Sequence, residues 1–210
     1  MKSANHLRIA VDGESGSGKS YASKIIGKKY KCYILNSGLA YRYSSYLILK
    51  HNPKKIIPFL KKKFKNLNYK KLIRINLHSE KISKHVASLA TIKSVRMIIK
   101  SWQRKIVLQN NRILVEGRDS ATVILKKKPK FDIAFYFDCS IKKSAYRRYI
   151  DLKKKIPYKK VLQNLRIRRQ KDRTRKHSAL KKHKKAVLIR SDLLSKQKMI
   201  QKMTREIDKL

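Results

Sequence analysis

An eight-residue stretch near the amino end, Gly13 to Ser20, constrains the fold of this chain more than any other feature. It reads Gly-Glu-Ser-Gly-Ser-Gly-Lys-Ser, with glycines at fixed spacing before a lysine and a serine. Glycines allow a tight turn in which successive backbone N–H groups face phosphate oxygens. An apolar run, Leu7 to Val11, precedes the stretch, and a helix-forming segment from Lys19 to about Lys28 follows it. This context favours a phosphate-binding loop over a surface loop rich in Gly and Ser.

The residues of this loop have separate predicted roles. The backbone is expected to cradle phosphates, and the helix that follows adds the positive end of its dipole. Lys19 is expected to reach the β- and γ-phosphates of ATP, and the Ser20 hydroxyl to bind Mg²⁺. The residues predicted to bind ATP, with Ser20 also predicted to bind the metal, are Gly13, Glu14, Ser15, Gly16, Ser17, Gly18, Lys19 and Ser20.

The charge of the chain favours anionic partners. Its 210 residues are enough for one large domain with a hydrophobic core. They include 57 Lys and Arg against 12 Asp and Glu, a formal net charge of +45. Nucleotides, nucleic acid bound without sequence specificity and anionic membrane surfaces all match this sign. A compositional bias that places lysine on every solvated face would give the same charge, so charge does not decide the function.

Cysteine usage and hydropathy indicate a soluble protein of a reducing compartment, expected to be cytoplasmic. Cys32 and Cys139 lie in apolar, strand-like runs and read as small buried hydrophobic residues. No Cys or His pair has the spacing of a zinc site. Neither a signal-peptide core nor a membrane-spanning apolar run is present in the sequence, so we expect no membrane association.

Strands alternate with helices along the chain, which predicts an α/β fold with a parallel sheet flanked by helices. A lysine-rich segment from about 53 to 84 interrupts this alternation and reads as an insertion. Its aromatic residues either mark a nucleic-acid patch or anchor the insertion to the core. The predicted strands are 7–11, 30–35, 72–77, 113–117, 132–138 and 186–189, and the predicted helices are 19–28, 41–49, 85–109, 141–154, 159–175 and 194–210.

Four blocks of sequence together resemble the bacterial cytidylate kinases, members of the nucleoside monophosphate kinase group of P-loop proteins. The first is Ile-Ala-Val-Asp-Gly at 9–13 with the loop that follows. The second is Asn-Ser-Gly-Leu-Ala-Tyr-Arg at 36–42, and the third is Val-Glu-Gly-Arg-Asp at 115–119 with Thr-Val at 122–123. The fourth, from Arg168 to Arg175, is the most discriminating. The blocks keep the order and spacing of the family to about residue 192.

The resemblance implies a P-loop nucleoside monophosphate kinase fold built as a single domain. Its core would comprise residues 1–52, 93–147 and 176–210. An insert at 53–92 would bind the monophosphate, and a mobile helical lid would span 148–175. The implied activity is transfer of the γ-phosphoryl group of Mg-ATP to CMP or dCMP, and we expect a monomer.

The resemblance also implies roles for individual residues outside the loop. Arg96 and Asp119 match positions that read the cytosine edge, while Arg118 matches a contact to the acceptor phosphate. Arg147 matches a residue that faces the ATP phosphates. The implied catalytic residues are Lys19, Arg118, Arg147 and Arg175, and the implied substrate-binding residues are Ser37, Tyr41, Arg42, Arg96, Arg118, Asp119, Arg168, Asp172 and Arg175.

The chemistry of these side chains suits phosphoryl transfer between two polyanions, which depends on positioning and charge neutralisation. Arginine forks and a lysine supply both. A carboxylate at Asp119 would accept a hydrogen bond from the exocyclic amine of cytosine. Two alternatives remain: a P-loop kinase for another small acceptor, and a basic RNA-binding protein with degraded kinase activity. Departures from the family pattern include Glu14 where proline is common, Asn36 where Asp is usual and Ala87 where a base-contacting serine is expected.

Overall fold

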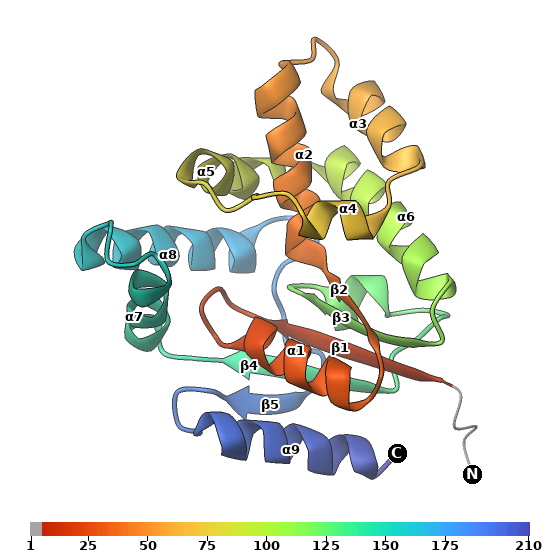
Figure 1. Cartoon of the computed structure of the whole chain (residues 1–210), viewed down its shortest axis with the longest axis vertical. Coiled ribbons are helices and arrows are strands. Elements are labelled where there is room, and N and C mark those ends of the chain that lie inside the picture. The colour runs from red at the N-terminus through yellow and green to blue at the C-terminus, as the bar shows by residue number, and fades with distance from the viewer. Residues whose placement is uncertain (1–5) are drawn as a thin grey trace. The chain divides into compact units, whose positions relative to one another are not determined.

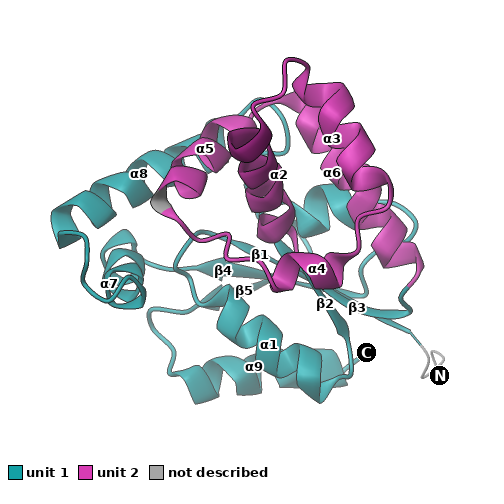
Figure 2. Cartoon of the chain, turned by 45° about the horizontal axis from the view of Figure 1, so that its top comes forward, with its two compact units in different colours: residues 1–35, 110–210 teal, residues 36–109 magenta. Residues whose placement is uncertain are grey.

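The structure, a computed structural model, describes residues 6–210, with only the backbone described at position 80. The chain forms two compact units (Figure 2). The first comprises residues up to 35 together with 110–210, and the second comprises residues 36–109. The division into core, insert and lid stays a prediction.

A five-stranded sheet lies at the centre of the first unit, with strand order β2-β3-β1-β4-β5 (Figure 1). The pairings of β1 with β3, of β1 with β4 and of β4 with β5 are all parallel, as predicted. The central strand β1 therefore ends between two parallel neighbours, which places the loop that follows it at the carboxyl edge of the sheet. The strands are β1 (Leu7–Gly13), β2 (Tyr33–Asn36), β3 (Arg112–Gly117), β4 (Ile133–Asp138) and β5 (Val187–Arg190).

The helices α1 and α9 pack against each other on one face of this sheet (Figure 1). Alternate residues of β1 and β4 supply the sheet side of the core, because successive strand residues point to opposite faces. Met199, Met203 and Ile207 meet them from α9 at intervals of four residues, one helical face. The first unit contains the helices α1 (Lys19–Lys29), α7 (Ile141–Asp151), α8 (Tyr158–Thr174) and α9 (Lys196–Asp208), with a short π-helical turn η1 (Ser120–Ile124).

The helices α7 and α8 follow each other along the chain and pack against each other as a helical hairpin, with a small apolar cluster of its own (Figure 1). Ala145 of α7 packs with Val161 and Leu165 of α8, and these three side chains are buried. Residues 152–157 connect the two helices. This hairpin corresponds to most of the segment 148–175 that the family resemblance describes as a lid.

The second unit is helical, and two sequence predictions for it are wrong. Residues 72–77 do not form a strand: Asn68 accepts a hydrogen bond from Lys70 N and caps a helix through Ile73. The predicted helix 85–109 is two helices that meet at a turn through residues 90–92, where Thr91 Oγ1 donates to Ser88 O at 2.7 Å. The helices are α2 (Ser37–His51), α3 (Ile56–Lys65), α4 (Tyr69–Ile73), α5 (Glu80–Leu89) and α6 (Lys93–Leu108).

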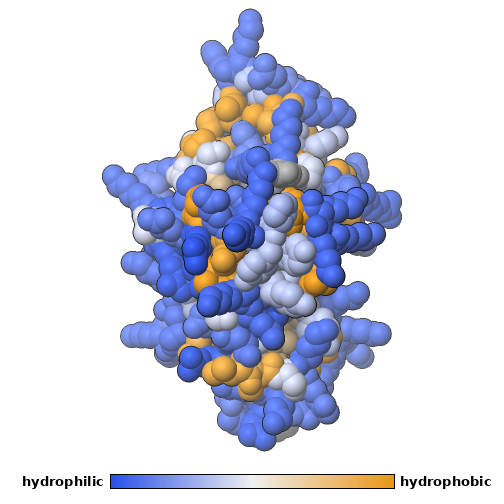
Figure 3. Space-filling model, turned by 90° about the vertical axis from the view of Figure 1, so that its left-hand side faces the viewer, coloured by the Kyte–Doolittle hydropathy of each residue, from blue (hydrophilic) through white to orange (hydrophobic). Residues whose placement is uncertain are grey.

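The 57 Lys and Arg residues of the chain favour a hydrophilic surface. The face in Figure 3 is mostly hydrophilic, with small separate hydrophobic areas. None of the helices described between residues 6 and 210 is long and apolar enough to span a membrane.

Candidate functional site

Two glycines allow the loop after β1 to pass close to other backbone segments. Gly13 has φ of +145°, and a Cβ atom there would stand 2.3 Å from the carbonyl oxygen of Phe137 in β4. Gly16 has φ of +76°, and its Cβ would stand 2.7 Å from the carbonyl oxygen of Ser144 in α7. Side chains rarely adopt these φ values, and neither position has space for one. The loop is thus held between the end of β4 and the start of the α7–α8 hairpin.

Lys19, the first residue of α1, is buried within this loop. Its Nζ donates to Glu14 O at 2.5 Å and to Ser17 Oγ at 3.3 Å. Burial, together with the nearby positive charge of Arg118, lowers the pKa of Lys19 to about 7. An anionic ligand in the loop would favour the charged form of this lysine.

Ser20 donates from its hydroxyl to Glu116 Oε1, at 2.7 Å. Glu116 stands near the carboxyl end of β3, where Val11 of β1 is its partner across the parallel pairing, and it is buried. A serine hydroxyl and a carboxylate side by side form an oxygen donor pair. This is the donor chemistry with which Mg²⁺ is held beside phosphates, so the residues present fit that metal.

Asp12, the residue before the loop, ties β1 to the segment that follows β3. Its carboxylate accepts hydrogen bonds from Ser120 N at 2.7 Å and from Ala121 N at 2.8 Å. Complete burial raises the pKa of Asp12 to about 6, against the opposing effect of these two bonds. Asp12 thereby fixes the backbone directly after Arg118 and Asp119.

Helix α8 carries a carboxylate that binds two of the predicted arginines. Asp172 Oδ2 accepts from Arg118 Nε at 3.0 Å, and Oδ1 accepts from Arg175 Nη1 at 2.9 Å. Burial acts to raise the pKa of Asp172, but the guanidinium groups of Arg118, Arg168 and Arg175 hold it below its ordinary value. Arg175 also donates from Nε to Ser178 O at 2.7 Å. The structure thus brings these four predicted residues together at the carboxyl end of β3.

Arg147 of α7, for which the resemblance implies a role facing the ATP phosphates, lies close to Gly18 of the phosphate-binding loop. A Cβ atom on Gly18 would stand 3.6 Å from Arg147 Nη1. The guanidinium group of Arg147 donates to Ser191 O at 2.7 Å and to Ser191 Oγ at 3.2 Å. These bonds hold the charged group at the loop.

Glu14 forms ion pairs with two residues of α8 that the sequence analysis did not select. Its carboxylate contacts the guanidinium group of Arg169 through Oε2, and Arg173 Nη2 lies 2.7 Å from Oε1. Arg169 also donates to Cys139 O, at the end of β4, at 2.8 Å. Burial raises the pKa of Glu14, and the two guanidinium groups oppose that shift.

The second unit holds the remaining predicted substrate-binding residues. The guanidinium carbon of Arg96 lies 5.3 Å from the centre of the Tyr41 ring, so these two predicted residues are neighbours. Arg42 Nη1 donates to Leu77 O at 2.9 Å and to Ser83 Oγ at 3.0 Å. Ser37 is buried at the first position of α2.

Asn36 retains one function that an aspartate would have at this position. Its side-chain oxygen accepts from Gly38 N at 2.9 Å and caps α2. An aspartate would cap the same helix equally well. Asn36, in place of the aspartate that is usual in the family, therefore keeps the helix cap but lacks its negative charge.

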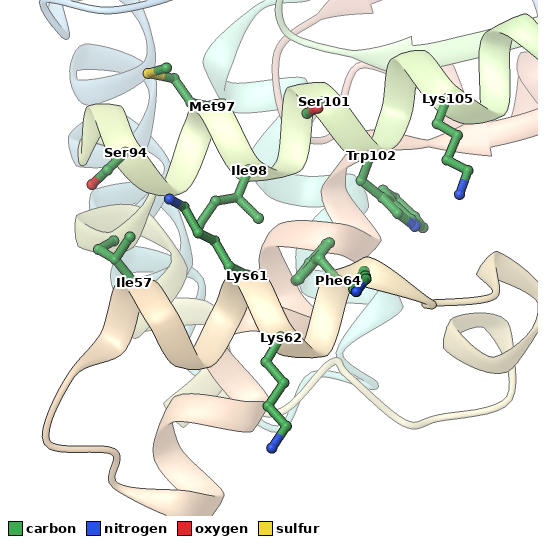
Figure 4. A pocket seen from close by; sticks show the side chains of 11 residues that line it. Ile57, Lys61, Lys62, Phe64, Ser94, Met97, Ile98, Ser101, Trp102 and Lys105 are labelled. Atoms are coloured by element: carbon green, nitrogen blue, oxygen red, sulfur yellow. The ribbon is translucent and has the colours of Figure 1, made fainter.

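A separate cavity of about 790 Å³ lies in the second unit, between α3 and α6 (Figure 4). Phe64 and Trp102 line it together with lysines, and Met97 and Ser94 border it from α6. None of the predicted site residues lines this cavity. Part of its lining, between Ile57 and Lys65, belongs to the insert at 53–92 that the resemblance describes as binding the monophosphate.

Four residues that make polar contacts around the phosphate-binding loop and the end of β3 were not selected from the sequence. Glu116 had a usable signal, because an acid at the carboxyl end of a buried strand lies where ligands bind. Arg169 and Arg173 are four residues apart and so share a helix face. Because this segment contains many other Arg and Lys residues, the spacing did not distinguish the pair. Asp12 belongs to the block at 9–13 that carries the family resemblance, which implies no role for it.

Comparisons with known proteins agree on one family. A family profile described as cytidylate kinase matches residues 9–209. The chain is 29% identical to a cytidylate kinase of Fusobacterium nucleatum, over 98% of this chain and 99% of that protein. It is 30% identical to a cytidylate kinase of Clostridium botulinum, over 97% and 98% of the respective chains. Among solved structures, a shikimate kinase from Bacteroides thetaiotaomicron has a TM-score of 0.51 at 9% identity, covering 96% of this chain and 98% of that one. This last likeness concerns the fold alone.

Proposed function

The chain belongs to the cytidylate kinase family, and from this we propose that it transfers the γ-phosphoryl group of ATP to CMP or dCMP, giving ADP and CDP or dCDP. The observation that carries the proposal is the group of charges around the loop after β1. Lys19 lies within the loop, Arg147 lies against it, and Arg118 contributes to lowering the pKa of Lys19. A site of this composition neutralises a polyphosphate.

In the proposed reaction the first unit binds the donor and the phosphate of the acceptor. The loop N–H groups and Lys19 hold the β- and γ-phosphates, and Arg147 neutralises charge on the transferring group. Arg118 and Arg175, oriented by Asp172, hold the acceptor phosphate. The acceptor phosphate is already largely a dianion at neutral pH, with a second pKa of about 6, so the attacking oxygen needs no strong base. A monomer suffices for this arrangement.

We assign recognition of the base to Asp119 and Arg96, with Tyr41 and Arg42 beside them and Ser37 and Arg168 binding the acceptor. Arg96 and Tyr41 support this because they are neighbours in the second unit. Asp119 begins the turn η1, whose backbone is held by Asp12. A carboxylate fixed in this way accepts from the amine of cytosine and repels the carbonyl of uracil.

Ser20 and Glu116 are the residues that would hold Mg²⁺. When bound, the metal neutralises charge on the β- and γ-phosphate oxygens. Glu116 orients the Ser20 hydroxyl through the 2.7 Å hydrogen bond between them.

An ADP-release assay with Mg-ATP and CMP, dCMP, UMP or AMP tests the proposal. CMP and dCMP should react at least about tenfold faster than UMP, because the wrong base leaves a buried polar group without a partner. Equal rates for CMP and UMP would favour a P-loop kinase of other specificity, and absence of ADP release with every acceptor would contradict the proposed activity.

Asp119→Asn is expected to reduce the ratio of kcat/KM for CMP to that for UMP. An amide can turn its N–H₂ group toward the uracil carbonyl, so discrimination by charge is lost. The matched control is Asp151→Asn, which removes the same charge from an exposed position at the end of α7. An unchanged ratio in Asp119→Asn would remove Asp119 from base recognition.

A further inference from the structure

Glu14 is a carboxylate placed inside a loop built for anions, in a chain where acids are rare. The protein has 12 acidic residues against 57 basic ones. Glu14 follows the first glycine of the loop and is only 2% exposed. A negative charge at this position opposes the binding of a polyphosphate, so its presence requires a physical reason.

The partners of Glu14 supply that reason. Arg169 and Arg173 lie four residues apart on one face of α8, and each contacts one oxygen of the carboxylate. The contact joins the phosphate-binding loop to the lid helix, which lies about 155 residues further along the chain. Asp172, from the same helix, binds Arg118 at 3.0 Å. The helix is therefore attached to the ends of two neighbouring strands, β1 and β3.

We propose that Glu14 is a positioning residue that, in the absence of ATP, holds α8 against the loop by standing in for a phosphate. A carboxylate and a phosphate both accept from guanidinium groups, so the two compete for Arg169 and Arg173. When ATP enters the loop, its phosphate oxygens take over the arginines and the carboxylate loses these partners. The inference rests on the proposed binding of ATP in this loop.

Two consequences distinguish this inference from a purely structural ion pair. Removing the charge of Glu14 strengthens the binding of a triphosphate, because the arginines are no longer occupied and the repulsion is gone. The same change loosens α8 in the ATP-free protein, because the ion pairs to the loop are lost while the contacts of Asp172 with Arg118 and of Arg169 with Cys139 O remain. A structural pair would show the second effect without the first.

Titration calorimetry on the full-length protein tests the first consequence with three probes: Mg-ATP, inorganic tripolyphosphate and adenosine. Glu14→Gln is expected to lower the Kd for Mg-ATP and for tripolyphosphate by on the order of tenfold, and to leave adenosine binding unchanged. Glu206→Gln is the matched control, since it removes the same charge from a surface ion pair with Lys209 in α9 and should alter none of the three. Glu14→Ala replaces the variant if the glutamine form does not fold.

Limited trypsin digestion tests the second consequence. In the empty protein, Glu14→Gln should be cut faster than wild type within residues 148–175, and Mg-ATP should slow the cutting of both. Binding of Mg-ATP that is equal or weaker in Glu14→Gln overturns the inference, as does unchanged cutting of the empty variant. Wild-type protein that binds neither Mg-ATP nor tripolyphosphate would instead contradict the proposed function, so the two failures are distinguishable.

Discussion

Single residues at this site have ionisation properties that follow from burial. Lys19 lies within the phosphate-binding loop and Asp12 directly before it, and both lose contact with water on folding. Desolvation disfavours the charged form of each, so the pKa of the lysine falls and that of the aspartate rises. These opposite shifts give two measurements that do not depend on turnover.

The pKa of about 7 for Lys19 predicts proton uptake when ATP binds at pH 8. At that pH the empty protein holds this lysine mostly neutral, and the triphosphate favours its charged form. Calorimetry in buffers of different ionisation enthalpy should show uptake of up to about one proton per ATP. In Lys19→Met the uptake should vanish and kcat should fall at least about a hundredfold, while the melting temperature is not lowered. Equal proton uptake in the variant would contradict the assignment.

Asp12 predicts a pH dependence of stability in mildly acid solution. Its pKa is about 6 in the folded protein and 3.8 in the unfolded chain, so the folded state binds the proton more tightly. The resulting stabilisation is fully present below about pH 4 and is lost as the pH rises through 6, a change of about 3 kcal/mol. Asp12→Asn has no such loss. The free energy of unfolding of the variant minus that of wild type should therefore rise as the pH increases from 4 to 6. Urea unfolding at several pH values measures this, and a constant difference between the two proteins would contradict it.

At the scale of elements, we propose that the α7–α8 hairpin is a separately mobile lid. Its apolar cluster is small, and polar contacts attach α8 to the loop and to the end of β3. A segment with few buried apolar contacts opens at a lower free energy than the central sheet. Closure of such a segment over ATP excludes water and limits hydrolysis.

Leu165→Ala should loosen this hairpin without loosening the sheet. The side chain is buried against Ala145 and Val161, and its truncation costs about 2–5 kcal/mol of local packing. Amide hydrogen exchange in α7 and α8 should become faster, whereas exchange in β1 and β4 stays slow. Leu193→Ala, at a side chain that is 67% exposed, is the control and should change neither. Uniform acceleration across the sheet would argue against an independent lid.

At the scale of the whole molecule, the sequence predicts the elements that local patterns encode. The loop, the central strands and the helices at both ends follow from glycine spacing and apolar periodicity. The strand expected at 72–77 was wrong because Ile73 and Ile75 do not share the burial of Leu72 and Leu77, and Ile73 is 62% exposed. The break at 90–92 contains neither glycine nor proline, so no local signal marks it.

The part of the site that depends on contacts distant in sequence was beyond prediction from the residues alone. The pairing of Glu14 with Arg169 requires the register of α8 against the loop, which no spacing in one sequence reveals. The hydrogen bonds from Ser120 and Ala121 to Asp12 likewise depend on how β3 pairs with β1. Arg118 and Asp119 could be selected because they follow a buried strand, a pattern that places side chains at the edge where ligands bind.

A crystal structure with CMP and a non-hydrolysable ATP analogue tests the central claim most directly. The account predicts the triphosphate in the loop at 13–20, with its terminal phosphates on Lys19. It predicts one CMP whose phosphate contacts Arg118 and whose base contacts Arg96 and Asp119. CMP bound in the cavity between α3 and α6, or bound without contact to Arg118 and Asp119, would contradict the account.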